Sequence, residues 1–124
     1  MSEKKYRILV ADAKDFLRDV IVESLGKETE CVCVSTPEEL CAKIGDVDAA
    51  VIGTNIWVDD LTIRYEAIAK LRQITTVPLL VLTSKHYSSI RIDLLKSGAD
   101  DVMTKPFNPD EMAIRVRKLI NRFG

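Results

Sequence analysis

Gly98-Ala99-Asp100-Asp101-Val102-Met103-Thr104-Lys105-Pro106-Phe107 is the most informative segment of this chain for the fold. It contains a short apolar run, Val102-Met103, which is followed after Thr104 by a lysine, a proline and an aromatic residue. A glycine such as the first residue commonly ends a helix. Asn108 and Pro109, which come next, are typical of a helix start. The stretch therefore predicts a strand over about Asp101–Thr104 between two helices, with Lys105 at the carboxyl end of the strand.

Outward from this stretch, apolar runs of strand length alternate with amphipathic segments of helix length. The other expected strands are about Tyr6–Ala11, Cys31–Ser35, Ala49–Gly53 and Leu79–Leu82. The expected helices begin at about Asp15, at Pro37 after a Thr36 cap, at Asp60, at Ser88 and at Pro109. This alternation is typical of βα units on a parallel sheet, and right-handed crossovers make the sheet doubly wound. We therefore predict an α/β, flavodoxin-like fold with five helices and strand order 2-1-3-4-5, as one domain over residues 1–124.

Composition excludes several classes of protein. The chain has 47% apolar and 30% charged residues and a formal net charge of −1. Such a charge provides no bulk attraction to nucleic acid or to an anionic membrane. No apolar stretch approaches the roughly 20 residues that span a bilayer, and no signal-peptide core follows the first residues. Three clustered cysteines are not typical of a secreted disulfide framework. The expected compartment is the cytoplasm, without membrane contact.

Polar residues stand at the carboxyl ends of the expected strands, where an open α/β sheet places its functional crevice. They are Asp12, Thr83 and Lys105, while the third strand ends in Gly53. Gly53 lies thirty residues before Thr83, and Thr83 lies twenty-two residues before Lys105. A carboxylate, a hydroxyl and an ammonium at this spacing resemble the CheY-like receiver domain of bacterial response regulators. The resemblance extends from Tyr6 to about residue 122.

The resemblance also implies a defect. In that family the third strand ends in an aspartate that accepts a phosphoryl group, and two acidic residues after the first strand bind Mg²⁺ with it. Here the acceptor position is Gly53, which has no oxygen to attack phosphorus, and the second acidic position is Ala13. The family's aromatic switch position on the fifth strand is Val102. We expect a pseudo-receiver that is not an enzyme, with a degenerate pocket formed by Asp12, Ala13, Gly53, Thr83 and Lys105, no catalytic residue and no Mg²⁺ site.

The segment from the fourth to the fifth helix resembles the OmpR/PhoB-type transcription-factor branch of the family. In that branch a DNA-binding domain follows the receiver, and receivers pair two-fold through helix four, strand five and helix five. The resemblance implies a homodimer, and DNA contact only through a C-terminal domain that is not in this chain. The expected interface residues are Arg91, Leu95, Asp100, Asp101, Glu111, Ala113, Arg115, Lys118 and Arg122, with Arg91 pairing with Glu111 and Asp101 with Arg115 across the axis. Lys96 departs from that branch, which usually has an acidic residue there.

Two alternatives stay open. The chain can be a stand-alone interaction receiver that binds a heterologous partner. It can also be a thiol or metal sensor, since Cys31 and Cys33 alternate onto one face of the second strand and Cys41 lies on the next helix. Three thiolates can hold a soft metal ion. Packing of small apolar cysteines in the core is the favoured explanation of all three.

Overall fold

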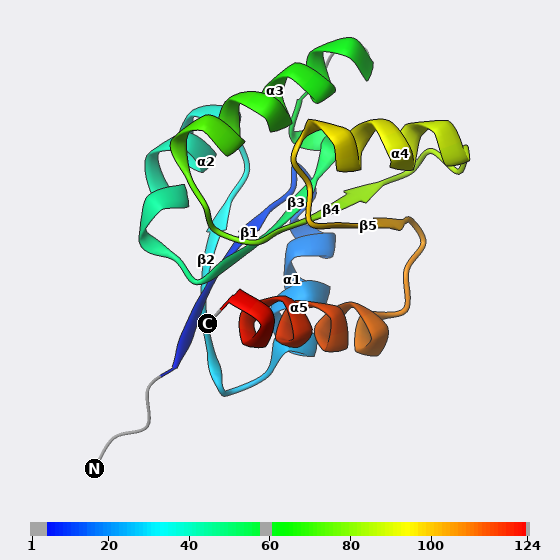
Figure 1. Cartoon of the computed structure of the whole chain (residues 1–124). Helices are drawn as coiled ribbons and strands as arrows, with labels where there is room; N and C mark the ends of the chain where they lie inside the picture. Colours follow the sequence, from blue (N-terminus) through cyan, green and yellow to red (C-terminus); the bar gives the residue numbers. More distant parts are fainter. Residues whose placement is uncertain (1–4, 58–60, 124) are drawn as a thin grey trace.

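Five parallel strands form one sheet in the order β2-β1-β3-β4-β5, as predicted (Figure 1). The computed structural model describes residues 5–57 and 61–123. The strands are β1 (Tyr6–Ala11), β2 (Thr29–Val34), β3 (Ala49–Gly53), β4 (Leu79–Thr83) and β5 (Asp101–Thr104). The helices are α1 (Asp15–Leu25), α2 (Pro37–Lys43), α3 (Leu61–Ile74), α4 (Ser88–Ser97) and α5 (Pro109–Phe123), with 3-10 turns η1 (Ile44–Asp46) and η2 (Thr54–Ile56).

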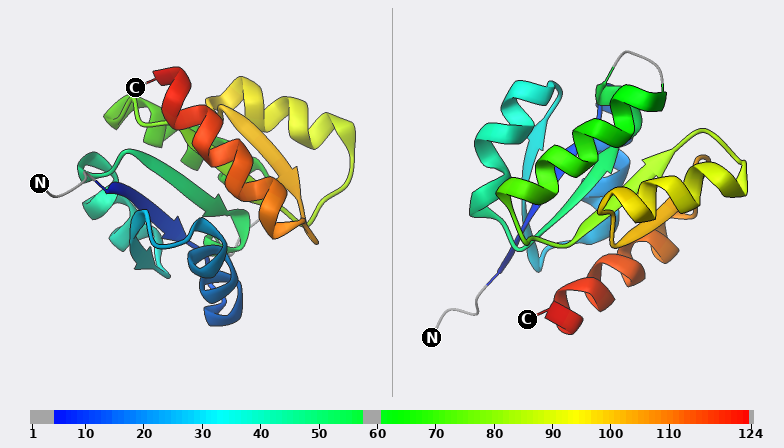
Figure 2. Two further views of the ribbon diagram at one scale, coloured as in Figure 1. Left: turned by 90° about the horizontal axis from the view of Figure 1, so that it is seen from below. Right: turned by 45° about the horizontal axis from the view of Figure 1, so that its top comes forward.

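The helices cover both faces of the sheet (Figure 2). On β1, Ile8 and Val10 pack in the core layer beneath α1 and α5, whereas Leu9 and Ala11 pack in the layer beneath α2, α3 and α4. Because alternate residues of a strand point to opposite faces, a strand buried on both faces must be apolar throughout. This requirement explains the unbroken apolar runs in the sequence.

Several element boundaries differ from the prediction. β2 ends at Val34 rather than Ser35, and β4 ends at Thr83 rather than Leu82. β2 begins at Thr29 rather than Cys31, because its backbone pairs with β1 from the Tyr6–Thr29 register onward. Backbone pairing needs no apolar side chain, so the sequence pattern did not mark these residues. α3 continues to Ile74, and its predicted start at Asp60 lies outside the described residues.

Local capping fixes where two helices begin. Thr36 Oγ1 accepts a hydrogen bond from the Glu39 backbone N–H at 3.2 Å, and Glu39 Oε1 accepts one from the Ser35 N–H at 3.1 Å. These contacts form a capping box at the start of α2, in which Glu39 reaches the N–H of the residue before the Thr36 cap. Asn108 Oδ1 caps α5 by accepting from the Asp110 N–H at 2.9 Å. The α5 cap places the helix start directly after the loop that carries Lys105.

Gly98 ends α4 with a φ of 130°, a conformation that residues with a Cβ rarely adopt.

Across residues 5–57 and 61–123, no helix is long and apolar enough to cross a membrane.

Candidate functional site

The carboxyl ends of the strands bring the predicted pocket residues together. Asp12 follows β1 and is fully buried, and Lys105 follows β5 with a side chain that is 15% exposed. The Lys105 ammonium lies 2.9 Å from Asp12 Oδ2. Thr83 ends β4, and its carbonyl accepts a hydrogen bond from the Lys105 N–H at 2.7 Å. The pocket therefore contains a buried and mutually neutralising ion pair.

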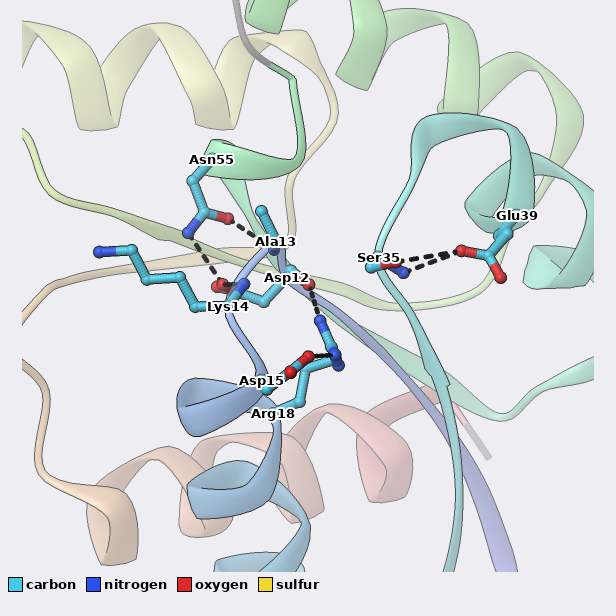
Figure 3. Close-up of polar contacts among 8 residues, drawn as sticks. All are labelled: Asp12, Ala13, Lys14, Asp15, Arg18, Ser35, Glu39 and Asn55. Carbon is cyan, nitrogen blue, oxygen red and sulfur yellow. Dashed lines mark hydrogen bonds and ion pairs between the residues drawn. The ribbon is translucent and has the colours of Figure 1, made fainter.

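The second oxygen of the Asp12 carboxylate is also engaged (Figure 3). Asp12 Oδ1 accepts hydrogen bonds from the Lys14 N–H at 2.9 Å and from Asn55 Nδ2 at 2.8 Å. Asn55 Oδ1 in turn accepts from the Ala13 N–H at 3.2 Å. Asn55 was not identified from the sequence. The only feature that could have indicated it is a polar amide side chain two residues beyond the end of β3. Asn55 joins the loop after β1 to the turn after β3.

A glycine is needed at position 53 because the Asp12 side chain lies very close to it, and not because of its backbone conformation. Its φ of −79° and ψ of 132° are ordinary extended values. A Cβ at this position would lie 2.9 Å from Asp12 Cγ, and closer still to Asp12 Oδ2. It would also lie 3.1 Å from Asn55 Oδ1. The Asp12 carboxylate therefore occupies the space where a side chain at position 53 would begin.

The residues present do not fit the Mg²⁺ ion that the family resemblance implies. Mg²⁺ prefers an octahedral set of oxygen ligands. Ala13 offers none, and both oxygens of Asp12 are taken by Lys105, Asn55 and the loop backbone. In the described part of the chain, no three His, Cys, Asp or Glu side chains lie close enough to hold a metal. Asp59 and Asp60, two further carboxylates near this part of the sequence, lie outside the described residues.

The switch positions of the family have structural contacts here. The Thr83 side chain is buried, and its hydroxyl accepts a hydrogen bond from the Lys85 N–H at 3.2 Å. Val102 is 7% exposed and packs in the core layer beneath α4. Trp57 packs in the same layer. A valine side chain has no ring to move between a buried and an exposed position.

The surface formed by α4, β5 and α5, which we call the α4–α5 face, combines apolar side chains with ion pairs. Leu95 and Ile92 on α4 are 45% and 49% exposed. Arg115 on α5 lies 3.0 Å from Asp101 and 3.1 Å from Glu111 within the same chain. A groove on this face is lined by Ser88, Arg91, Ile92, Leu95, Asp101, Val102 and Arg115. Lys118 and Arg122 are exposed further along α5.

Two residues of the expected interface have other roles. Ala113 is 2% exposed and packs against the sheet, because the buried face of α5 includes both Met112 and Ala113. The Asp100 carboxylate accepts from Arg72 at 2.7 Å and from the Leu79 N–H at 2.8 Å, so it is bound inside the chain. Ala113 therefore has little surface to offer a partner, whereas the Asp100 side chain is still 23% exposed. The Asp101–Arg115 pair also forms within one chain and needs no partner.

The three cysteines do not pack together in the core, so this explanation was wrong. Cys33 and Cys41 are exposed, and only Cys31 is half-buried, against the core layer beneath α1 and α5. Cys41 lies on α2, which covers the opposite face of the sheet. The three-thiol arrangement that the metal-sensor alternative requires is therefore not present among these cysteines.

Comparisons with known proteins agree with this geometry. The family model described as the response regulator receiver domain matches residues 8–117. The transcriptional regulatory protein SrrA of Staphylococcus aureus is 29% identical over 116 residues, which cover 93% of this chain and 48% of SrrA. The chain thus spans about half the length of the curated relatives it matches.

Solved structures show the same likeness. The receiver domain of the Francisella response regulator 1452 has a TM-score of 0.85 and 27% identity, covering 97% of this chain and 100% of that one. The Thermotoga maritima OmpR/PhoB homologue DrrB has a TM-score of 0.83 over 97% of this chain and 54% of its own, and its 21% identity shows the fold alone. Because the family model matches residues 8–117 and the sheet has the expected strand order, this chain belongs to the response regulator receiver domain family.

Proposed function

We propose that this receiver domain works without aspartyl phosphorylation, as a dimerisation and regulatory module of a bacterial signalling or transcription regulator. It is not an enzyme under this proposal. The observation that carries the proposal is the Asp12–Lys105 ion pair, whose carboxylate fills the space beside Gly53. Position 53 has no acceptor oxygen, and the space beside it is filled by the Asp12 carboxylate, which Lys105 already neutralises.

The electrostatics of the pocket support this view. Phosphoryl transfer requires a nucleophile together with cations that neutralise charge on the transferred group. Lys105, the cation expected to contact phosphoryl oxygens, is instead bound to the only buried carboxylate of the described residues. A buried ion pair is costly to break, because each charge left alone is poorly solvated. The closed pair therefore favours a single state of the pocket.

Homodimerisation through the α4–α5 face is the second part of the proposal. Leu95 and Ile92 provide exposed apolar area beside the Asp101–Arg115 pair. Exposed ion pairs contribute only about 0–1 kcal/mol each, so the charges would set the register while the apolar side chains provide the affinity. We propose that Arg91, which lines this groove, pairs with Glu111 of a second copy.

The wider role is inferred from the relatives. SrrA is named a transcriptional regulatory protein and is about twice as long as the stretch it shares with this chain. We propose that DNA contact belongs to a separate domain, and that the regulator acts in the cytoplasm.

Phosphodonor labelling tests the first part. The chain is incubated with acetyl phosphate and Mg²⁺, and its intact mass is measured. We expect no phosphorylated species, and stoichiometric labelling would overturn the proposal. Gly53→Asp alone should also stay unlabelled, because it lacks the second acidic metal ligand. Gly53→Asp combined with Ala13→Asp is the variant expected to gain labelling.

Sedimentation equilibrium tests the second part. The parent chain is compared with Leu95→Asp on the α4–α5 face and with Ile74→Asp as the matched control. Ile74 ends α3 and is 58% exposed, so both variants replace an exposed apolar residue by an acid. We expect the parent and Ile74→Asp to dimerise and Leu95→Asp to be monomeric. If all three are monomers at tens of micromolar, the homodimer is wrong and a heterologous partner is favoured.

A further inference from the structure

Cys31 and Cys33 form a pair on one face of β2. In register, Cys31 stands beside Ile8 and Cys33 beside Val10 of β1. Ile8 and Val10 both belong to the core layer beneath α1 and α5, and alternate residues of a strand share a face. The two thiols therefore lie on the α1 side of the sheet, on the opposite side from Cys41.

This pair is open to solvent at the edge of the sheet. β2 is an edge strand, Cys33 is exposed and Cys31 is half-buried. Thr29 Oγ1 lies 3.7 Å from Cys31 Sγ, within hydrogen-bonding distance of the sulfur. Desolvation by the surrounding protein raises the pKa of both thiols.

The spacing suits a bridging metal ion better than a disulfide. Alternate residues of a strand are about 6.6 Å apart and their Cβ atoms point in parallel directions. A disulfide needs Cβ atoms about 3.5–4.5 Å apart, which this strand geometry does not provide. A metal–thiolate bond of about 2.3 Å lets two sulfurs stand about 4.6 Å apart across one ion. The two side chains reach that separation by leaning toward each other.

We propose that Cys31 and Cys33 form a two-thiolate binding site for a soft monovalent metal ion, with Cu(I) as its probe. Thiolate ligands select Cu(I) among the metals available to proteins. Zn²⁺ requires four ligands, and among the described residues no third His, Cys, Asp or Glu side chain completes a metal-binding group. On binding, the two thiols release two protons and form two metal–sulfur bonds, without any transfer of electrons.

The site is independent of the proposed dimer. β2 stands at one edge of the sheet and β5 at the other, so the cysteine pair and the α4–α5 face lie far apart in the strand order. The site is also distinct from a three-cysteine centre, since Cys41 takes no part in it. Cys41 therefore provides a matched control within the same chain.

The test is an anaerobic titration of the reduced chain with Cu(I), in competition with the chromophoric chelator bicinchoninate. Cys31→Ser, Cys33→Ser and Cys41→Ser are titrated in parallel, and circular dichroism checks that each variant is folded. X-ray absorption of the loaded chain then counts the sulfur ligands. Cys33 is exposed, so its serine variant tests the site even if Cys31→Ser fails to fold.

We expect one Cu(I) per chain, held by two sulfur ligands. Loss of either ligand should weaken binding by more than the roughly 10–100-fold that removal of an outer-shell partner costs. Cys41→Ser should bind like the parent. The inference is overturned if the parent cannot compete with the chelator, if Cys41→Ser binds as weakly as Cys33→Ser, or if one ion binds per two chains.

Discussion

Gly53 shows how one residue decides the chemistry of the pocket. Its extended backbone would accept any residue, so the glycine is not there for a turn. Its lack of a side chain instead leaves room for the Asp12 carboxylate, which lies within 2.9 Å of where a Cβ would stand. The same substitution that removes the acceptor thus permits Asp12 and Lys105 to meet at 2.9 Å.

Gly53→Ala should destabilise the chain by about 1–3 kcal/mol, the usual cost of forcing extra volume into a packed site. The added methyl group must displace the Asp12 carboxylate and disturb its ion pair with Lys105. Urea denaturation measures the change. The matched control is Gly45→Ala, because a Cβ at exposed Gly45 meets no atom within 4 Å. Equal stability of both variants and the parent would contradict this account of Gly53.

Arg72 connects several elements at the end of the sheet opposite the pocket. Its guanidinium donates to the Gly98 carbonyl at 2.7 Å and to the Asp100 carboxylate at 2.7 Å. It also donates to the carbonyls of Thr75 and Val77 in the loop before β4. One side chain from α3 therefore holds the α3–β4 loop and the α4–β5 turn together.

Arg72→Lys should lower the free energy of unfolding by about 2 kcal/mol, although the charge is kept. A single ammonium cannot reproduce the forked set of bonds, and the part-buried carbonyls of Thr75, Val77 and Gly98 would lose donors, at a cost toward the lower end of the roughly 1–3 kcal/mol range for a buried group, about 1 kcal/mol each. Chemical denaturation measures the effect. Arg117→Lys, at an exposed position on α5, is the control and should change stability by less than about 0.5 kcal/mol. If both variants change the free energy of unfolding equally, Arg72 does not hold the α3–β4 loop and the α4–β5 turn together.

The α2 capping box should depend on pH. Hydrogen bonds from the Ser35 N–H and the Thr36 hydroxyl lower the pKa of Glu39 from its usual 4.5. Because the folded-state pKa is the lower one, the carboxylate stabilises the helix start above the unfolded-state pKa, and this contribution is lost as pH falls through the folded-state pKa. Glu39→Gln should therefore have a lower Tm than the parent at pH 7. The difference should shrink below pH 4.5 and disappear in more acidic buffer, and a difference that is constant with pH would contradict the assignment.

In the whole molecule, the pocket and the proposed interface lie on different surfaces. The pocket opens at the carboxyl ends of the strands, whereas the α4–α5 face lies along the side of the sheet beyond β5 (Figure 1). Lys105 and Val102 connect the two through β5, since they are three residues apart on one short strand and its loop. Under the proposed function, assembly through this face does not depend on a phosphoryl group in the pocket.

Arg115→Asp should abolish the proposed dimer without unfolding the chain. The change places a third acidic side chain beside Asp101 and Glu111, and like charges on this face repel across a two-fold axis. Arg117→Asp, on the other side of α5, carries the same change in charge and should dimerise like the parent. Sedimentation equilibrium distinguishes the two variants. Dissociation of both would point to net charge rather than to this face.

Much of this fold could be predicted because its signals are local. The apolar runs, the Thr36 and Asn108 caps and the stop at Gly98 depend on neighbouring residues, and each predicted element is present. Asp12, Thr83 and Lys105 could be assigned to one pocket because all parallel strands end at the same edge. Ala113 was misplaced because helical periodicity alone does not define how wide the buried stripe of α5 is.

Residue type and short-range spacing were enough to predict the βα order, the residues at the strand ends and the missing acceptor oxygen at Gly53. Which of these groups contact one another depends on the packing of distant segments. Lys105 pairs with Asp12 from 93 residues away, and Asn55 bridges the same carboxylate from another loop. Arg72 binds Asp100 across 28 residues. Such contacts depend on how the strands and helices pack in three dimensions, and a burial pattern along one element does not contain that information.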